Sequence, residues 1–335
     1  MDLYHIPGDT GGNWRMRKFV EYQHEVPSIH YRVMGNYIVD WIPDRDDAVM
    51  MCWYMSASYN EITCMLLQEL FDWRSLTPRT VKDYCQRFWK ETKPVLDFGS
   101  SRKYAKNMDW FPTLMEAFIR TTHCRPYDWL RGLIQGDSVE DYRRVFNAVS
   151  SLPYTGRFAA DLFMESVLYL GEYLGVELTE PSLLNWKKCS NLTSGLLNIF
   201  YYDEEANEYD KTGKLPVSEK FLTKKLEIVQ RRIEKVYPEQ DNDINLFIGK
   251  ICSFRNLFKS SRYGGFHHDR ELGVLREYER LLPDFQYLWD RAFELRENMF
   301  DKRFLGEFHD WDGIRPERKK LWLREGLTGV EKVTC

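Results

Sequence analysis

One segment of the chain, residues 255–270, combines side chains suited to acid–base chemistry and to phosphate binding. It contains four cations, two glycines, two histidines and one carboxylate: Arg255, Lys259, Arg262, Arg270, Gly264, Gly265, His267, His268 and Asp269. Guanidinium and ammonium groups bind phosphate or pyrophosphate. A histidine paired with Asp269 is a candidate general base near neutral pH. The alternative is a solvated turn in which Asp269 pairs with Arg262 or Arg270.

Other familiar chemistries lack their motifs. His267 and His268 are neighbours and point to different faces of regular structure, so we expect no metal site. The seven cysteines contain no Cys-x-x-Cys pair, which predicts reduced, mostly buried thiols. A Walker loop, a Rossmann glycine pattern, a serine-nucleophile motif and His-Glu-x-x-His are all missing from the sequence. We therefore expect no cofactor and no nucleotide hydrolysis.

The elements that would position a site are organised around residues 150–163, which predict a helix-hairpin-helix. Pro153 would end the first helix, Gly156 would supply a positive φ, and Thr155 would cap the second helix. The first backbone N–H groups of that second helix could then meet a DNA phosphate. The predicted DNA contacts are Tyr154, Thr155, Gly156 and Arg157. An ordinary helical hairpin is the alternative.

Two apolar runs predict the core around this hairpin. Residues 158–174 are apolar nearly all round and predict a central pillar helix. Residues 48–55 and 62–71 predict two buried helices separated by a polar break. Within the break, Tyr59 and Asn60 either satisfy the core or contact a substrate.

Composition and organisation indicate a mostly α protein. Its net charge of −4 requires any nucleic-acid contact to come from a local basic patch. We expect an irregular N-terminal arm over residues 1–45, a helical body over 46–300 with irregular insertions, and a helical tail over 301–335. The acidic run at 203–214 predicts a solvated surface excursion. Without a signal-peptide pattern or an apolar run of about 18 residues, we expect a soluble, cytoplasmic protein.

The hairpin Leu152–Ala160, with a pillar helix and a loop after it, resembles the helix-hairpin-helix DNA glycosylase superfamily. In that superfamily the loop normally offers a catalytic aspartate. The equivalent residues 178–186 contain no aspartate, and Glu180 is their only carboxylate. This departure puts ordinary base excision in doubt.

A closer resemblance is to phage-encoded relatives of that fold, the alpha-glutamyl/putrescinyl thymine pyrophosphorylases or amino acid:DNA transferases, and to the helical domain attached to 5-hydroxymethyluracil DNA kinases. The matching pieces are Tyr59–Asn60, Leu152–Ala160, Trp186–Cys189 and Tyr263–Arg270. The resemblance implies that an amine, such as an amino acid or putrescine, displaces pyrophosphate from pyrophosphorylated 5-hydroxymethyluracil in double-stranded DNA. It implies no membrane partner, a location in the host cell cytoplasm, and a 5-hydroxymethyluracil DNA kinase as a partner.

The residues found from the sequence then take roles in that reaction. Catalysis falls to His268, Asp269 and Arg270, with His268 as the base. Substrate binding falls to Tyr59, Asn60, Trp186, Lys187, Arg255, Lys259 and Arg262, with Trp186, Tyr59 or Tyr263 as the platform for a flipped base. The competing hypotheses are a DNA glycosylase with Glu180 as its acid, and a non-catalytic DNA-binding subunit.

Overall fold

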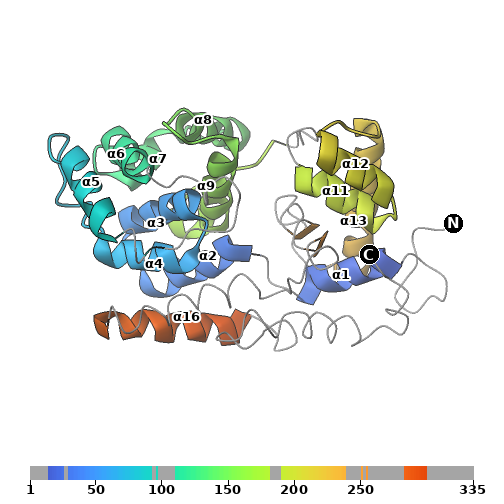
Figure 1. Ribbon diagram of the computed structural model, residues 1–335, viewed down its shortest axis with the longest axis horizontal. Helices are drawn as coiled ribbons and strands as arrows, with labels where there is room; N and C mark the ends of the chain where they lie inside the picture. Colours follow the sequence, from blue (N-terminus) through green and yellow to red (C-terminus); the bar gives the residue numbers. More distant parts are fainter. Residues whose placement is uncertain are drawn as a thin grey trace. The chain divides into compact units, whose positions relative to one another are not determined.

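The computed structural model describes residues 14–25, 29–92, 96, 110–181, 190–238, 250–251, 254–255 and 283–299. The chain divides into two compact units (Figure 1). The hairpin unit comprises residues 30–181 and 270–298, and the composite unit comprises residues 1–29, 182–269 and 299–335. The regular structure of the described residues is helical, which confirms the mostly α prediction. The predicted single body over residues 46–300 does not correspond to either unit.

Helix α3 (Arg45–Ser58) is the centre of the hairpin unit, because every residue from Ala48 to Ser58 is buried. It packs against α4 (Glu61–Leu70), α7 (Pro126–Gly132) and α9 (Arg157–Tyr169). The predicted pair of buried helices with a short break between them is therefore confirmed.

The hairpin unit contains further helical elements, most of which are labelled in Figure 1. They are α2 (Ile29–Trp41), α5 (Val81–Thr92), α6 (Phe111–Thr122), α8 (Ser138–Ser150), α10 (Gly171–Leu174), the 3₁₀ helix η3 (Pro283–Phe285) and α16 (Gln286–Met299). The predicted pillar helix over residues 158–174 is divided at Leu170, where φ is −91° and ψ is 10°, into α9 and α10. Leu170 is buried, so the division redirects the chain without exposing the pillar.

Large aromatic side chains fill the core of the hairpin unit. The ring of Trp53 on α3 stacks on Phe118 of α6, with centroids 4.3 Å apart and planes 9° apart. Phe163 of α9 and Trp129 of α7 meet Phe118 edge-on, at 6.2 and 5.6 Å. These rings join four helices, so part of the high aromatic content serves packing rather than surface recognition.

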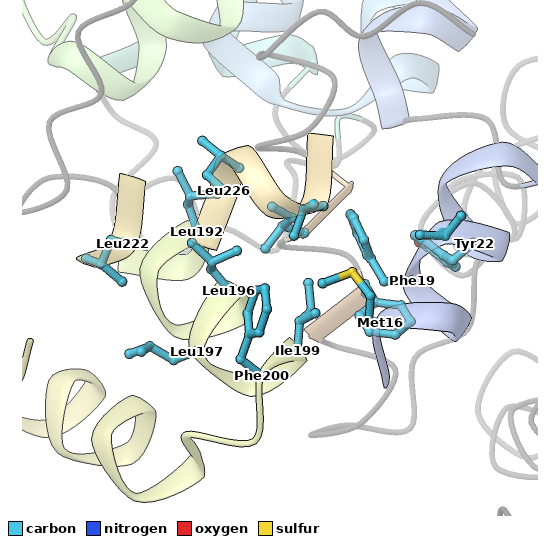
Figure 2. Packing of buried hydrophobic residues seen from close by; sticks show 14 of the residues in the cluster. Met16, Phe19, Tyr22, Leu192, Leu196, Leu197, Ile199, Phe200, Leu222 and Leu226 are labelled. Carbon is cyan, nitrogen blue, oxygen red and sulfur yellow. The ribbon is translucent and has the colours of Figure 1, made fainter. Parts of the chain in front are cut away.

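The composite unit contains α1 (Trp14–Glu25), α11 (Ser190–Ile199), α12 (Asp203–Thr212) and α13 (Glu219–Val236). Met16, Phe19 and Tyr22 of α1 face the same core as Leu192, Leu196 and Phe200 near α11 (Figure 2). That core also includes Leu222 and Leu226 of α13. Segments from opposite parts of the chain therefore build one hydrophobic core.

Two sequence predictions differ from the structure. Residues 14–25 and 29–41, expected in an irregular arm, form α1 of the composite unit and α2, which lies mostly in the hairpin unit. Apolar residues three apart give α1 a face for the core. The acidic run expected as a solvated surface excursion forms α12, which packs through the buried residues Ala206 and Tyr209, while Glu204, Glu208 and Asp210 are exposed as expected. Its first-turn acids favour the positive end of the helix dipole. The predicted tail over residues 301–335 lies outside the described residues.

Candidate nucleic-acid interface

The turn between α8 and α9 reverses the chain through Leu152, Pro153, Tyr154 and Thr155. The Thr155 N–H donates to the Leu152 carbonyl at 3.1 Å, which closes a four-residue turn. Pro153 holds the second position, which suits its fixed φ, and Tyr154 holds the third with φ of 61°. The expectation that Gly156 supplies the positive φ is wrong, because Gly156 lies at φ −75° and ψ 173°. A tyrosine in this left-handed conformation costs about 1–2 kcal/mol relative to glycine.

Helix α9 begins without a side-chain cap. Gly156 is its N-cap residue and has no side chain to accept a hydrogen bond. Thr155, the predicted cap, is buried instead, and its hydroxyl donates to the Pro153 carbonyl at 3.4 Å. The cap prediction is wrong because the turn ends one residue later than expected. The first turn of this 13-residue helix thus carries the positive end of its dipole and no side-chain acceptor.

The hairpin is attached to the core of its unit through α3. Ser56 of α3 is buried, and its hydroxyl donates to the Ala159 carbonyl at 2.7 Å. Leu152 and Thr155, which flank the tip, are also buried. Anchors on both sides of Tyr154 therefore hold the tip in a defined position relative to α3.

Two aspartates, one at the N-cap and one in the first turn, stabilise the start of α8. Asp137 is the N-cap residue, and its carboxylate accepts from the Glu140 N–H at 3.1 Å. Asp141 is fully buried and accepts from the N–H groups of Gln135 at 3.0 Å and Gly136 at 2.9 Å. It also pairs with Arg144 on the next turn. These hydrogen bonds attach the connection between α7 and α8 to the first turns of α8.

The exposed surface of the hairpin tip is aromatic. Tyr154 is 67% exposed, and its ring centroid lies 6.4 Å from that of Trp110, with planes 30° apart. Trp110 precedes α6 and is half-buried. Sequence reasoning missed Trp110 because it follows a segment with no periodic pattern.

Tyr59 and Asn60 lie at the junction of α3 and α4, where Tyr59 ends α3 and Asn60 precedes α4. Tyr59 is the C-cap of α3, in the left-handed region at φ 50° and ψ 41°, and its N–H donates to the Met55 carbonyl at 2.8 Å. Asn60 is 1% exposed, and its Oδ1 accepts from the Thr63 N–H at 2.8 Å. Asn60 therefore caps α4.

Glu180 lies in a loop that is fastened to the start of α8. The Thr179 N–H donates to the Ser138 carbonyl at 3.1 Å, and the two hydroxyls are 2.9 Å apart. The Tyr142 hydroxyl donates to Glu180 Oε1 at 3.4 Å. Burial, followed by the negative charge of Glu180, raises the pKa of Tyr142 and keeps it protonated. The structure thus supplies Glu180 with a hydroxyl partner that the sequence did not reveal.

Arg255 is the described cation of the segment at 255–270, and it belongs to the composite unit. Its guanidinium pairs with Asp210 of α12, and the Ser194 hydroxyl donates to the same carboxylate at 2.5 Å. Binding pyrophosphate through Arg255 would therefore compete with Asp210. The other residues predicted for catalysis and substrate binding lie outside the described residues: His268, Asp269, Arg270, Trp186, Lys187, Lys259, Arg262 and Tyr263. The same is true of the Arg157 side chain.

Across the described ranges, no group of three or more His, Cys, Asp or Glu side chains is placed to hold a metal ion. Cys52, Cys64, Cys85 and Cys124 are free cysteines. Among the helices that the structure describes, none combines the length and apolar character needed to cross a membrane.

Comparison of the chain with protein-family models, with curated proteins and with solved structures found no match in any of the three. The clearest features of the chain's own geometry are the exposed, anchored tip between α8 and α9 and the start of α9, which has no side-chain cap.

Proposed function

We propose that the protein binds DNA through the α8–α9 hairpin and transfers an amine onto a pyrophosphorylated 5-hydroxymethyluracil base, releasing pyrophosphate. The observation that carries the proposal is the start of α9, where a 13-residue helix begins at Gly156 without a side-chain cap beside an exposed turn. Backbone N–H groups at such a helix start bind phosphate without reading sequence. This fits an enzyme that recognises a modified base rather than a long DNA sequence.

The proposed reaction is a substitution at the exocyclic methylene carbon of the base. The neutral amine nitrogen forms a bond to that carbon while the carbon–oxygen bond to pyrophosphate breaks. The electron pair leaves with pyrophosphate, and the proton of the new ammonium passes to a base, for which His268 beside Asp269 is our candidate. Cations of the segment at 255–270 stabilise the negative charge of the departing pyrophosphate, and Arg270 is the cation nearest in sequence to the candidate general base His268.

The test supplies duplex DNA containing pyrophosphorylated hydroxymethyluracil together with glycine, glutamate or putrescine. We expect pyrophosphate release and a heavier nucleoside after enzymatic digestion, measured by mass spectrometry. His268→Ala should abolish the new nucleoside and leave DNA affinity unchanged. Absence of a new nucleoside with every amine would reject the transferase proposal. A hydroxymethyluracil DNA kinase is the proposed partner that would supply the modified DNA.

The position of Glu180 favours a DNA glycosylase as the second candidate function. A loop that follows the pillar helices presents this carboxylate to the Tyr142 hydroxyl, and Asp161 and Glu165 also act electrostatically on Tyr142. A glycosylase would release a free base and leave an abasic site, which hot alkali converts into a strand break. Glu180→Gln should abolish such breaks, whereas amine transfer should survive this substitution.

A further inference from the structure

The hairpin tip presents an aromatic side chain to solvent that packing does not require. Among the large hydrophobic side chains of the described residues, Tyr154 has the greatest exposed fraction, at 67%. The other exposed aromatic residues there are Tyr201 at 48% and Tyr169 at 37%. The Tyr169 hydroxyl donates to Asn36 at 2.6 Å, and the Arg15 guanidinium covers Tyr201 at 4.4 Å. Tyr154 differs because, within the part of the chain that the structure describes, its ring contact is with Trp110 alone.

The two rings of Tyr154 and Trp110 form a small aromatic platform. Their centroids are 6.4 Å apart and their planes are inclined by 30°, so they provide adjoining faces rather than a closed stack. The position of Tyr154 is fixed by the turn. Leu152 and Thr155, which lie before and after Tyr154, are joined by the backbone hydrogen bond of the turn, and both are buried. A planar ring system is the partner that such faces suit best.

The occupant is indicated by what lies next to the platform. Two residues after Tyr154, Gly156 is the N-cap residue of α9, and the positive end of that helix favours an anion. A planar group beside an anionic group is the chemistry of a nucleotide. In a fully paired duplex the base faces are stacked on one another, so only an unpaired or displaced base offers a free face.

We propose that Tyr154 and Trp110 stack on an unpaired nucleobase of the DNA that the hairpin binds, so that the protein selects DNA with a displaced base over fully paired duplex. The inference depends on DNA binding by the hairpin and not on amine transfer.

The experiment measures fluorescence polarisation of three labelled DNAs: a single strand, a paired duplex and the same duplex with one bulged base. The variants are Tyr154→Phe, which keeps the ring, and Tyr154→Gly, which removes the ring and relieves the positive φ. Tyr201→Gly is the matched control, since Tyr201 is also an exposed tyrosine with positive φ, at 63°.

We expect wild-type protein and Tyr154→Phe to prefer the bulged duplex and the single strand over the paired duplex. Tyr154→Gly should bind those two DNAs about 5- to 100-fold more weakly and change little on paired duplex. Equal losses on all three DNAs, no loss at all, or an equal effect of Tyr201→Gly would overturn the inference, as would failure of wild-type protein to bind DNA. Selective loss in a protein that transfers no amine would keep the stacking inference and reject the proposed function.

Discussion

Helix α8 offers a controlled test of how the hairpin is held, because two similar ion pairs lie side by side on it. Asp141 pairs with Arg144 and Glu140 pairs with Arg143, both three residues apart. The Asp141 side chain is 1% exposed, whereas that of Glu140 is 49% exposed. Replacing each acid with alanine therefore makes the same kind of deletion in two environments.

The expected costs differ by several kilocalories per mole. Asp141→Ala leaves the Gln135 and Gly136 N–H groups without their carboxylate acceptor; because both residues are exposed, water can replace part of each bond, and the cost is about 1–1.5 kcal/mol each. It also removes the partner of Arg144, which retains its bond to the Leu133 carbonyl at 3.0 Å and is 27% exposed. Since Arg144 can be partly rehydrated, we expect a total loss of about 3–4 kcal/mol. Glu140→Ala should cost under about 1 kcal/mol.

The assay is urea unfolding followed by far-UV circular dichroism, with the free energy of unfolding extrapolated to water. Asp141→Asn provides an intermediate case, since it keeps one oxygen acceptor and loses the charge. We expect the order of destabilisation to be Asp141→Ala, then Asp141→Asn, then Glu140→Ala. Equal destabilisation by the two alanine variants would refute the reasoning that burial and the two backbone amides set the cost.

Three further predictions concern capping, close packing and thiol reactivity. Asn60→Ala should lower the free energy of unfolding by about 1–2 kcal/mol. Asn60→Ser keeps a side-chain acceptor for the cap and should lower it less. Equal losses in urea unfolding would contradict the role of the Asn60 side chain as the cap of α4. Gly195→Ala should destabilise by about 1–3 kcal/mol, because its Cβ would lie 2.6 Å from a side-chain carbon and 2.9 Å from the carbonyl of Ile251. The control Gly132→Ala meets no atom within 4 Å and should be neutral or raise the melting temperature. Burial raises the pKa of the Cys85 thiol to about 12, so iodoacetamide at pH ~8 should alkylate the less buried Cys124 faster than Cys85. Peptide mass spectrometry measures the two labelling rates, and equal rates would contradict this order.

Local sequence signals were reliable where a helix start depends on one side chain. Asp137 and Ser218 are residue types that favour the N-cap position, and each accepts an N–H bond at the start of α8 or α13. The buried helices before and after Tyr59 were also predictable, because long apolar runs can satisfy their backbone only as buried helices or strands. These features are decided within a few residues of the chain.

The details of the candidate interface were not predictable in the same way. Sequence reasoning assigned the positive φ to Gly156, since glycine adopts it at no steric cost, yet Tyr154 adopts it. Leu152 and Thr155 are buried on either side, and this packing holds a conformation that tyrosine does not prefer. The Tyr142–Glu180 contact likewise joins residues 38 positions apart and leaves no local pattern.

By itself, the sequence determined that this protein is mostly helical, that α3 and α4 are buried, and that a tight turn joins α8 to α9, because propensity, capping and apolar periodicity act locally. Only the tertiary structure decided that α1 shares a core with α11 and α13, that Tyr154 projects beside Trp110, and that Glu180 meets Tyr142. Such contacts are fixed by packing between distant segments, whose free energy exceeds the local preference of any one residue.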